Sequence, residues 1–476
     1  RSTLFPYTTL FRSRTGDLRA EHGEYRAGSN YYSAVFSSDP NDFVGPQFNF
    51  EPFSDGRTTD LTAKVDYDFG FATFTSITNR TRFSQIVRGD ADFRNPVASP
   101  AGFRGLGIQI GQGQNQELRT TSQEIRLVSN GDGAVRWLAG GYYLQTDRAL
   151  VTRFYADFNS DPAQFEAPML LLFGNEESND NRAYAGFAQV DVDIAPTLTL
   201  TGGLRYDEDR REQLDRVTDA VREATFDHLQ PKLTVTWKPQ SERLVYATYS
   251  TGFRSGGFNA PNSTVPVFGQ ETLDNFEIGF KSQLFGRWLT LNGAAFLTDV
   301  DDYQYFYVEA NTGSQTIDTI DAVRIKGLEL EAQARLAEGL DAAVAIGVID
   351  SEIRSSRFPE DVGNRAPRTI PFSATSSLQY RRALWEQMEG FVRLEWQHYG
   401  RKYWHQDNVA VQRSYDIVNA RVGVERGAVG FYGFVRNALD DDYYGEFFVP
   451  KFSGLDIATG YPGAPRTFGV EAEVKF

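Results

Sequence analysis

Leu328-Glu-Leu-Glu-Ala-Gln-Ala-Arg-Leu336 has an apolar side chain at every second position, with Glu, Gln or Arg between them. Successive side chains of a β-strand point to opposite faces, so this stretch predicts a strand with one apolar and one polar face. The same alternation ends the chain, from Phe468 to Phe476, and recurs at 61–69, 198–206 and 392–397. Alternation alone does not show whether the apolar face packs on a protein core or on lipid.

The connections between strands separate these two possibilities. About 17 candidate strands occur, most of roughly ten residues, which is enough for a tilted strand to cross a bilayer. Tight turns are expected at Gly70, 130–133, 195–196, 239–242, 285–286, 337–339 and 426–428. They alternate with long polar connections near 83–114, 147–181, 208–227, 252–273, 300–320, 354–366, 400–413 and 440–464. This order predicts an all-β, antiparallel, up-and-down transmembrane barrel with short periplasmic turns and long extracellular loops.

Composition agrees with a barrel and excludes several other classes. Aromatic residues make up 14% of the chain and 43 residues are Gly, which suits interfacial aromatic girdles and close strand packing. Cysteine is absent, which removes disulfides and thiol chemistry. A net charge of -15 argues against nucleic acid as a partner.

The N-terminal part predicts a truncated barrel. Residues 1–13 contain an adapter-like run, Thr3 to Ser13, which we interpret as a non-native scar, and no secretory signal is recognised. Residues 14–60 are expected to be irregular, as an extracellular loop, with the barrel over 61–476. An odd number of strands then implies that at least one upstream strand is missing, because such barrels have an even number. The expected product is an open or strained barrel, since unpaired edges are costly in lipid.

Several local motifs resemble TonB-dependent outer-membrane receptors. They are Val245-Tyr-Ala-Thr-Tyr-Ser-Thr-Gly-Phe-Arg-Ser-Gly-Gly-Phe-Asn259, Leu273 to Leu284, the strand from Trp288 to Gln304, Ile325-Lys-Gly-Leu-Glu-Leu-Glu331, Val435-Arg-Asn-Ala-Leu-Asp440, and Arg466 to Phe476. These segments occur in the family's order over residues 61–476.

The resemblance implies a barrel of 22 strands, of which about five would be absent here together with the plug domain. It implies import of a scarce nutrient, a ferric siderophore or similar ligand, with TonB-coupled energy, at the bacterial outer membrane. The expected partners are the TonB complex, outer-membrane lipids, a small ligand such as a metal chelate or oligosaccharide, and the barrel assembly machinery, which reads Phe476. Without a plug and TonB box, the chain as given is not expected to perform energised transport.

Candidate functional residues follow from this architecture. Polar residues of the alternating strands are expected to line the lumen: Glu329, Glu331, Gln333, Arg335, Glu471, Glu473 and Lys475. Aromatic and arginine side chains in the long connections are suited to stack on or pair with a ligand: Arg153, Tyr155, Arg254, Phe258, Tyr303, Tyr305, Tyr307, Tyr403 and Trp404. Girdle residues at a membrane interface share this composition.

No metal, cofactor or catalytic site is predicted. The acidic groups at 299–302 and 440–442 match no ordered calcium loop, and the four histidines contain no close metal-binding pair. No Ser/His/Asp arrangement or phosphate-binding glycine motif is present, so an enzyme is not expected.

Other functions remain open alternatives. A passive outer-membrane porin would need no plug, and a protease or lipase barrel would use fewer strands with a catalytic group at its rim. A soluble β-rich binding module would have to pack its apolar faces on one another.

Overall fold

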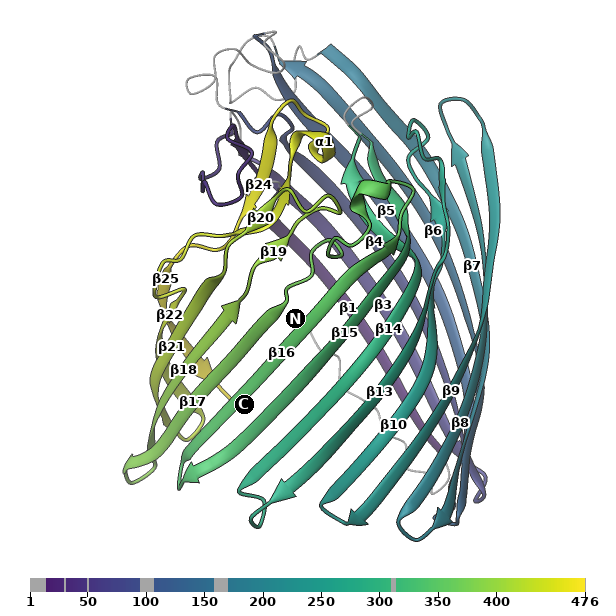
Figure 1. Cartoon of the computed structure of the whole chain (residues 1–476), viewed down its shortest axis with the longest axis vertical. Helices are drawn as coiled ribbons and strands as arrows, with labels where there is room; N and C mark the ends of the chain where they lie inside the picture. Colours follow the sequence, from purple (N-terminus) through teal and green to yellow (C-terminus); the bar gives the residue numbers. More distant parts are fainter. Residues whose placement is uncertain are drawn as a thin grey trace.

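The computed structural model describes residues 14–29, 31–48, 51–94, 107–157, 170–309 and 314–475. Within these ranges the chain is dominated by one antiparallel sheet of 18 strands. Its strands tilt steeply and wrap around a common interior (Figure 1). They are β1 (Arg14–Gly28), β3 (Phe53–Asp68), β4 (Ala72–Asp90), β5 (Gln109–Ser129), β6 (Val135–Asp157), β7 (Leu170–Ala195), β8 (Leu198–Asp215), β9 (Val221–Gln240), β10 (Arg243–Arg254), β13 (Glu271–Leu284), β14 (Leu289–Val308), β15 (Gln315–Ala337), β16 (Leu340–Ser355), β17 (Phe372–Trp385), β18 (Met388–Tyr399), β21 (Tyr415–Arg426), β22 (Val429–Arg436) and β25 (Thr467–Val474).

Each strand of the sheet pairs with the next one along the chain, which confirms the up-and-down topology. The sheet is open, because β1 pairs only with β3 and β25 only with β22 among the described residues. The expectation of an open barrel is thus met. The strand Arg14–Gly28 corrects two other expectations, since it pairs over its whole length with Phe53–Asp68. Residues 14–60 are therefore not one irregular loop. The 18 strands of the sheet in the described ranges are an even number, which removes the parity argument for a missing strand.

The seven predicted short turns lie at one end of the sheet, which we call the short-turn rim (Figure 1). A further short turn there, between Trp385 of β17 and Met388 of β18, was not predicted. The turn between β15 and β16 shows why glycine is required in it. Gly339 has φ +73°, and a Cβ at this position would lie 1.9 Å from the carbonyl oxygen of Arg381. The opposite end, the long-loop rim, differs from expectation, because β4 to β9, β14 and β15 extend well into the predicted loops at 83–114, 147–181, 208–227 and 300–320.

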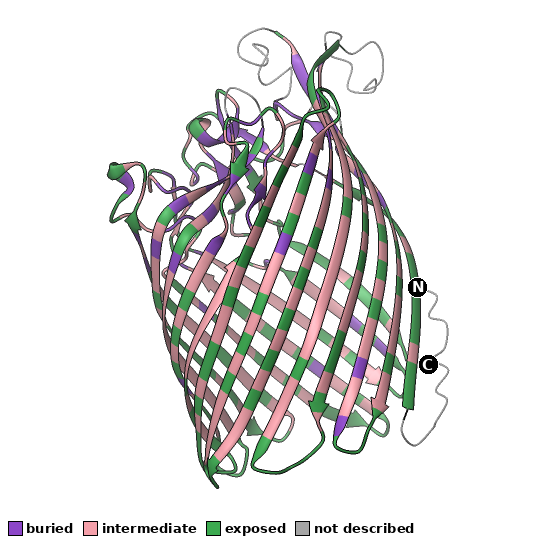
Figure 2. Ribbon diagram, turned by 90° about the vertical axis from the view of Figure 1, so that its right-hand side faces the viewer, coloured by how far each residue is buried: buried purple, intermediate pink, exposed green. Residues whose placement is uncertain are grey.

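Alternation along the strands defines two faces of the sheet (Figure 2). Leu328 and Leu330 are 60% and 43% exposed and share what we call the apolar face with Ile278, which is 58% exposed. Glu329 and Glu331 lie on the opposite, polar face, directly across from Ala294 and Asn292. Large apolar side chains that remain exposed on one continuous face are typical of a sheet that contacts lipid.

Smaller elements occupy the long-loop rim. One small sheet consists of β2 (Ser33–Val35), β23 (Tyr444–Phe448) and β24 (Ala458–Pro462). Two further strand pairs are β11 (Gly257–Phe258) with β12 (Val267–Phe268), and β19 (Lys402–Tyr403) with β20 (Val411–Gln412). The helices are the 3-10 helix η2 (Pro359–Asp361) and α1 (Pro450–Ser453). Within the described residues, no helix is long and apolar enough to cross a bilayer.

Candidate functional site at the long-loop rim

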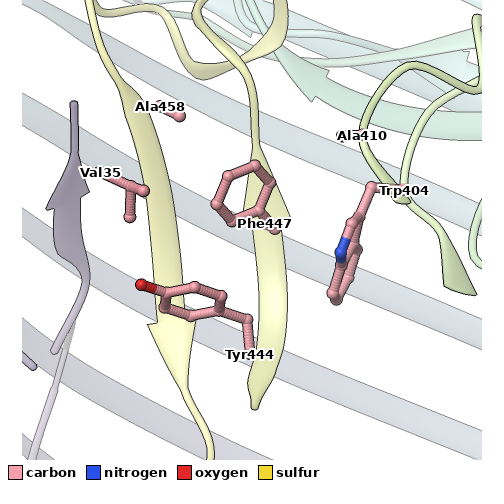
Figure 3. Packing of buried hydrophobic residues seen from close by; sticks show 6 residues of the cluster. All are labelled: Val35, Trp404, Ala410, Tyr444, Phe447 and Ala458. Atoms are coloured by element: carbon pink, nitrogen blue, oxygen red, sulfur yellow. The ribbon is translucent and has the colours of Figure 1, made fainter. Parts of the chain in front are cut away.

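Connections that are far apart in sequence pack together at the long-loop rim. A group of buried side chains, the mouth cluster, joins the β1–β3, β18–β21 and β22–β25 connections (Figure 3). It consists of Val35, Trp404, Ala410, Tyr444, Phe447 and Ala458. The Phe447 ring lies 5.4 Å from that of Tyr444 and 6.4 Å from that of Trp404, measured between centroids. Burial of these aromatic side chains is the main force that holds the connections in one arrangement.

Tyr444 also fixes this arrangement through its hydroxyl group. The hydroxyl accepts a hydrogen bond of 2.8 Å from the backbone N–H of Val44 and donates one of 3.2 Å to the carbonyl of Asp42. Residues 42–44 and Tyr444 belong to connections about 400 residues apart in the chain. A fully buried phenol with both of its hydrogen-bonding functions used adds specificity to the apolar packing.

Beside the mouth cluster lies a pocket of about 170 Å³, which we call the mouth pocket. Strand β14, the β16–β17 and β18–β21 connections and helix α1 supply its lining. The lining residues are Tyr303, Gln304, Tyr305, Phe306, Pro367, Arg368, Trp404, His405, Gln406 and Phe452. Below it, Tyr303 and Tyr305 pack on a second buried group, formed by Val300, Ile320, Val323, Ile353 and Ala366. The pocket therefore has a rigid aromatic wall on a strand and a second wall made by loops.

Arg368 is the central charged residue of the mouth pocket. Its guanidinium lies 2.8 Å from Glu446 and 5.6 Å from the centre of the Phe448 ring. Its backbone has φ +63° and donates a 2.6 Å hydrogen bond to the carbonyl of Tyr403. A non-glycine residue in this conformation is strained, and such strain persists only where the surroundings fix it.

The carboxylate of Glu446 also holds a third connection. Its second oxygen accepts a 2.5 Å hydrogen bond from the hydroxyl of Tyr32, in the β1–β3 connection. Burial, followed by the negative charge of Glu446, raises the pKa of Tyr32, so the phenol stays protonated and remains a donor.

Positive charge is concentrated near the mouth pocket. Lys402 lies with its ammonium 4.4 Å from the centre of the Trp404 ring. Burial, with a further contribution from the charge of Arg368, lowers the pKa of Lys402 to about 8. Because two cations disfavour each other in a partly buried site, an anion bound there would relieve the repulsion.

His405 contributes a neutral ring to the same pocket. It is 4% exposed, and its ring stacks on Phe452 with centroids 4.3 Å apart. Its Nε2 accepts a hydrogen bond of 3.4 Å from the backbone N–H of Val449. Burial, and secondly the charge of Arg368, lowers the pKa of His405 to about 3. The ring is therefore uncharged near neutral pH.

Two buried polar atoms of the lining have no hydrogen-bond partner among the described residues. They are Nε1 of Trp404 and Oε1 of Gln406. Both side chains are only 2% exposed, so these atoms are enclosed by the packed connections. The lining of the pocket offers a ligand the guanidinium of Arg368 and the aromatic faces of Tyr303, Tyr305, Phe306, Trp404 and Phe452.

The predicted ligand-binding residues divide into separate groups. Tyr303, Tyr305 and Trp404 line the mouth pocket. Tyr307 adjoins it, stacked on Tyr305 with centroids 5.6 Å apart, and Tyr403 lies under the guanidinium of Arg365 at 5.9 Å.

The remaining candidates lie outside the mouth pocket. Arg254 is 3.6 Å from Glu271, whose carboxylate also accepts a hydrogen bond from the backbone of Gln304, so this arginine is linked indirectly to the pocket lining. Phe258 lies on β11. Arg153 and Tyr155 lie near the end of β6, where Arg153 is 4.0 Å from Glu176.

Sequence reasoning missed Arg368, His405 as a pocket residue, and the Gln and Phe residues of the lining. Arg368 follows Pro367 in a connection without any alternation, so no local pattern marks it. His405 was considered only as a metal ligand. Among the described residues no group of three or more His, Asp or Glu side chains could hold a metal ion.

The predicted lumen residues lie on the polar face and several make ion pairs there. Arg335 is 3.6 Å from Asp341, and Gln333 lies opposite Thr290. At the end of the chain, Glu471 is 3.2 Å from Arg421, Glu473 accepts a 3.4 Å hydrogen bond from Tyr432, and Lys475 is 3.9 Å from Glu425. Phe476 and residues 1–13 lie outside the described residues.

Comparison with known proteins places this architecture in a family. The family model described as TonB dependent receptor-like, beta-barrel, matches residues 4–438. The chain is 22% identical over 280 residues to the pesticin receptor of Yersinia enterocolitica, covering 57% of this chain and 39% of that protein. It is 25% identical over 220 residues to a probable TonB-dependent siderophore receptor of Acinetobacter baumannii, covering 40% of this chain and 28% of that protein. The chain thus spans about two fifths or less of the length of these curated relatives.

Solved structures agree on the fold. The ferric yersiniabactin uptake receptor from Yersinia pestis superposes with a TM-score of 0.78 at 18% identity, over 98% of this chain and 68% of that one. The siderophore receptor from Acinetobacter baumannii gives 0.77 at 16% identity, over 97% and 71%. The chain belongs to the TonB-dependent receptor-like β-barrel family.

Proposed function

We propose that this chain is the barrel portion of an integral bacterial outer-membrane receptor that imports a scarce nutrient, a ferric siderophore or a similar chelate, with TonB-coupled energy. The observation that carries the proposal is the mouth pocket, in which Arg368 lies among aromatic side chains at the long-loop rim. Lys402 adds a second positive charge nearby, over the ring of Trp404. We infer that the long-loop rim is extracellular and the short-turn rim periplasmic, as is usual for such barrels.

The chemistry of the mouth pocket fits a ferric chelate. Iron-chelating ligands bind through catecholate, phenolate or carboxylate oxygens, so their complexes are commonly anionic and often aromatic. Arginine pairs with carboxylates and phenolates and also stacks on rings, and Tyr and Trp supply flat apolar surfaces. The volume of about 170 Å³ holds part of such a molecule, and the rest would lie in the open mouth. Relatives named for siderophore uptake support the same class.

The polar face of the sheet concerns the path of the nutrient through the barrel. We infer that Glu329, Glu331, Gln333, Arg335, Glu471, Glu473 and Lys475 line a hydrated lumen, where they contact a plug domain. The proposed partners are the TonB complex, outer-membrane lipids and the barrel assembly machinery, which would read Phe476. The receptors to which the chain is similar are transport proteins, and we propose no enzymatic role.

Uptake of radioactive iron tests the proposal. The complete gene that carries this sequence is expressed in cells with and without TonB, and uptake is measured from ferric yersiniabactin, a ferric catecholate and ferric citrate. We expect uptake of one chelate that requires TonB and falls in the Arg368→Gln variant. Uptake that is equal without TonB, together with open-channel conductance in planar bilayers, would show a passive porin instead. Recovery of the chain in the soluble fraction without detergent would show a soluble binding module.

A further inference from the structure

The apolar face of β5 to β8 contains a hollow that neither the mouth pocket nor the lumen explains. Gly141 on β6 and Gly186 on β7 lie directly opposite each other in the sheet. Ile125 lies opposite Gly141, and Tyr206 lies opposite Gly186, so larger side chains stand on both sides of the glycine pair. The hollow has a volume of about 620 Å³.

Tyrosines border the hollow on the side toward the long-loop rim. Tyr143 and Tyr184 are cross-strand partners, and their ring centroids are 5.2 Å apart. Amphipathic aromatic side chains at this level are typical of the boundary between the hydrocarbon layer and the headgroups. Since the apolar face is the one expected to contact the membrane, the glycine pair lies at the depth of the lipid acyl chains.

Arginines follow immediately beyond the tyrosines. The group, which we call the arginine arc, consists of Arg80, Arg82, Arg119, Arg182 and Arg210. Arg82 lies directly opposite Arg119, and Arg182 directly opposite Arg210. Like charges placed directly across a β-ladder repel each other, so a nearby anion stabilises each of these pairs.

Internal acidic residues compensate only part of the arginine arc. Arg182 is 2.8 Å from Asp180 and Arg210 is 2.7 Å from Glu208, while Arg119 is 3.8 Å from Glu117. Asp147 on β6 also lies directly opposite Arg119 in the ladder. In the described part of the chain, Arg80 and Arg82 make no ion pair, and both are exposed. The unpaired positive charge is therefore concentrated on β4, next to Arg119 on β5.

We propose that this surface binds a phosphorylated lipid of the outer leaflet. One acyl chain lies in the hollow over Gly141 and Gly186, and a headgroup phosphate pairs with Arg80, Arg82 and Arg119. Guanidinium groups bind phosphate in a bidentate manner, and basic groups at the membrane interface are typical headgroup sites. This inference uses the outer-membrane location given under the proposed function, but it does not depend on which chelate is imported.

Two variants separate the acyl-chain and headgroup parts of the site. Gly186→Leu adds a side chain to the hollow, and its Cβ has open space, because nothing lies within 4 Å of a Cβ there. Its matched control is Gly433→Leu on β22, where a Cβ also has open space. Arg80→Gln with Arg82→Gln removes the unpaired charge, and its control is Arg354→Gln, an exposed arginine paired with Glu352 on β16.

Binding of diphosphoryl lipid A to the full chain in mild detergent is measured by native mass spectrometry. We expect saturable binding of one lipid, weakened at least tenfold by Gly186→Leu and by the double arginine variant, and unchanged in both controls. Equal binding by all variants would overturn the site. Inorganic phosphate that competes as strongly as the lipid, or a dimer that Gly186→Leu abolishes, would overturn the assignment of a lipid. Because no chelate is present, failure here is distinct from failure of the proposed import function.

Discussion

The guanidinium of Arg368 lies 2.8 Å from the carboxylate of Glu446, across 78 residues of sequence, and the same carboxylate accepts a hydrogen bond from Tyr32. One acidic side chain thus joins the β1–β3, β16–β17 and β22–β25 connections. Charge-assisted hydrogen bonds of this kind are stronger than neutral ones, and they fix geometry as well as adding stability. The mouth pocket keeps its shape because these connections are tied to one another.

Replacement of Arg368 by Gln should loosen the long-loop rim without affecting the barrel. The ion pair is partly exposed, with side chains 43% and 28% accessible, so we expect a loss of about 1 kcal/mol in docking of the connections. Amide hydrogen exchange in residues 437–466 should therefore rise about fivefold. Arg354→Gln, which breaks a similar exposed pair with Glu352, should leave this exchange unchanged. An equal effect of both variants would contradict the role of Arg368.

His405 should make the mouth pocket sensitive to acid. Its pKa is about 3 in the docked connection and about 6.5 when the connection is undocked, so the undocked form binds a proton first as the pH falls. Docking is thus fully stable above pH 6.5 and is weakened progressively between about pH 6.5 and 3. Limited proteolysis of the β18–β21 connection should therefore become faster as the pH falls from 6.5 to 3. His405→Gln keeps a hydrogen-bond acceptor but cannot titrate there, and it should reduce the effect, whereas an unchanged pH profile would refute this account.

Phe447 should carry much of the stability of the mouth cluster. Its side chain is fully buried, and a Phe→Ala change at such a site costs roughly 3–5 kcal/mol. We expect Phe447→Ala to open the β22–β25 connection to hydrogen exchange while the barrel strands stay protected. Val409→Ala, at a position 75% exposed in a neighbouring connection, is the control and should have little effect. Loss of protection throughout the sheet would mean that the cluster stabilises the whole fold.

Gly339 should be intolerant of a side chain. Alanine there adds the cost of a left-handed backbone, about 1–2 kcal/mol, to a clash with the carbonyl of Arg381. Gly339→Ala should therefore lower the yield of the heat-modifiable folded form on gel electrophoresis. Gly433→Ala, which has open space at its Cβ, should fold normally, and equal yields from the two variants would contradict the turn geometry.

Much of the fold could be predicted because lipid-facing strands carry a two-residue alternation. Strand β1 was missed because Arg14–Gly28 has few apolar side chains on either face, and it is recognisable only through its pairing with β3. The strands near the long-loop rim were underestimated for a related reason. Around Asp180 and Arg210 the hairpins continue with polar side chains on both faces, so pairing persists after the alternation of apolar residues has ended.

The candidate site was less predictable because tertiary contacts build it. Residue type alone identified Tyr303, Tyr305 and Trp404, since aromatic residues in the connections were sought as ligand contacts. Arg368 could not be singled out, because its importance depends on Glu446, which no sequence pattern relates to it. The same reasoning grouped Arg153 with these residues, although it lies on another part of the rim.

Titration of the full chain in detergent with ferric chelates tests the central claim most directly. Ferric yersiniabactin, a ferric catecholate and ferric citrate are added in turn, and the fluorescence of Trp404 is followed against a Trp404→Phe control. We predict that at least one chelate quenches this fluorescence saturably and that Arg368→Gln weakens its binding at least tenfold. If no chelate quenches the folded chain, or if Arg368→Gln binds as well as the wild type, the mouth pocket is not the ligand site.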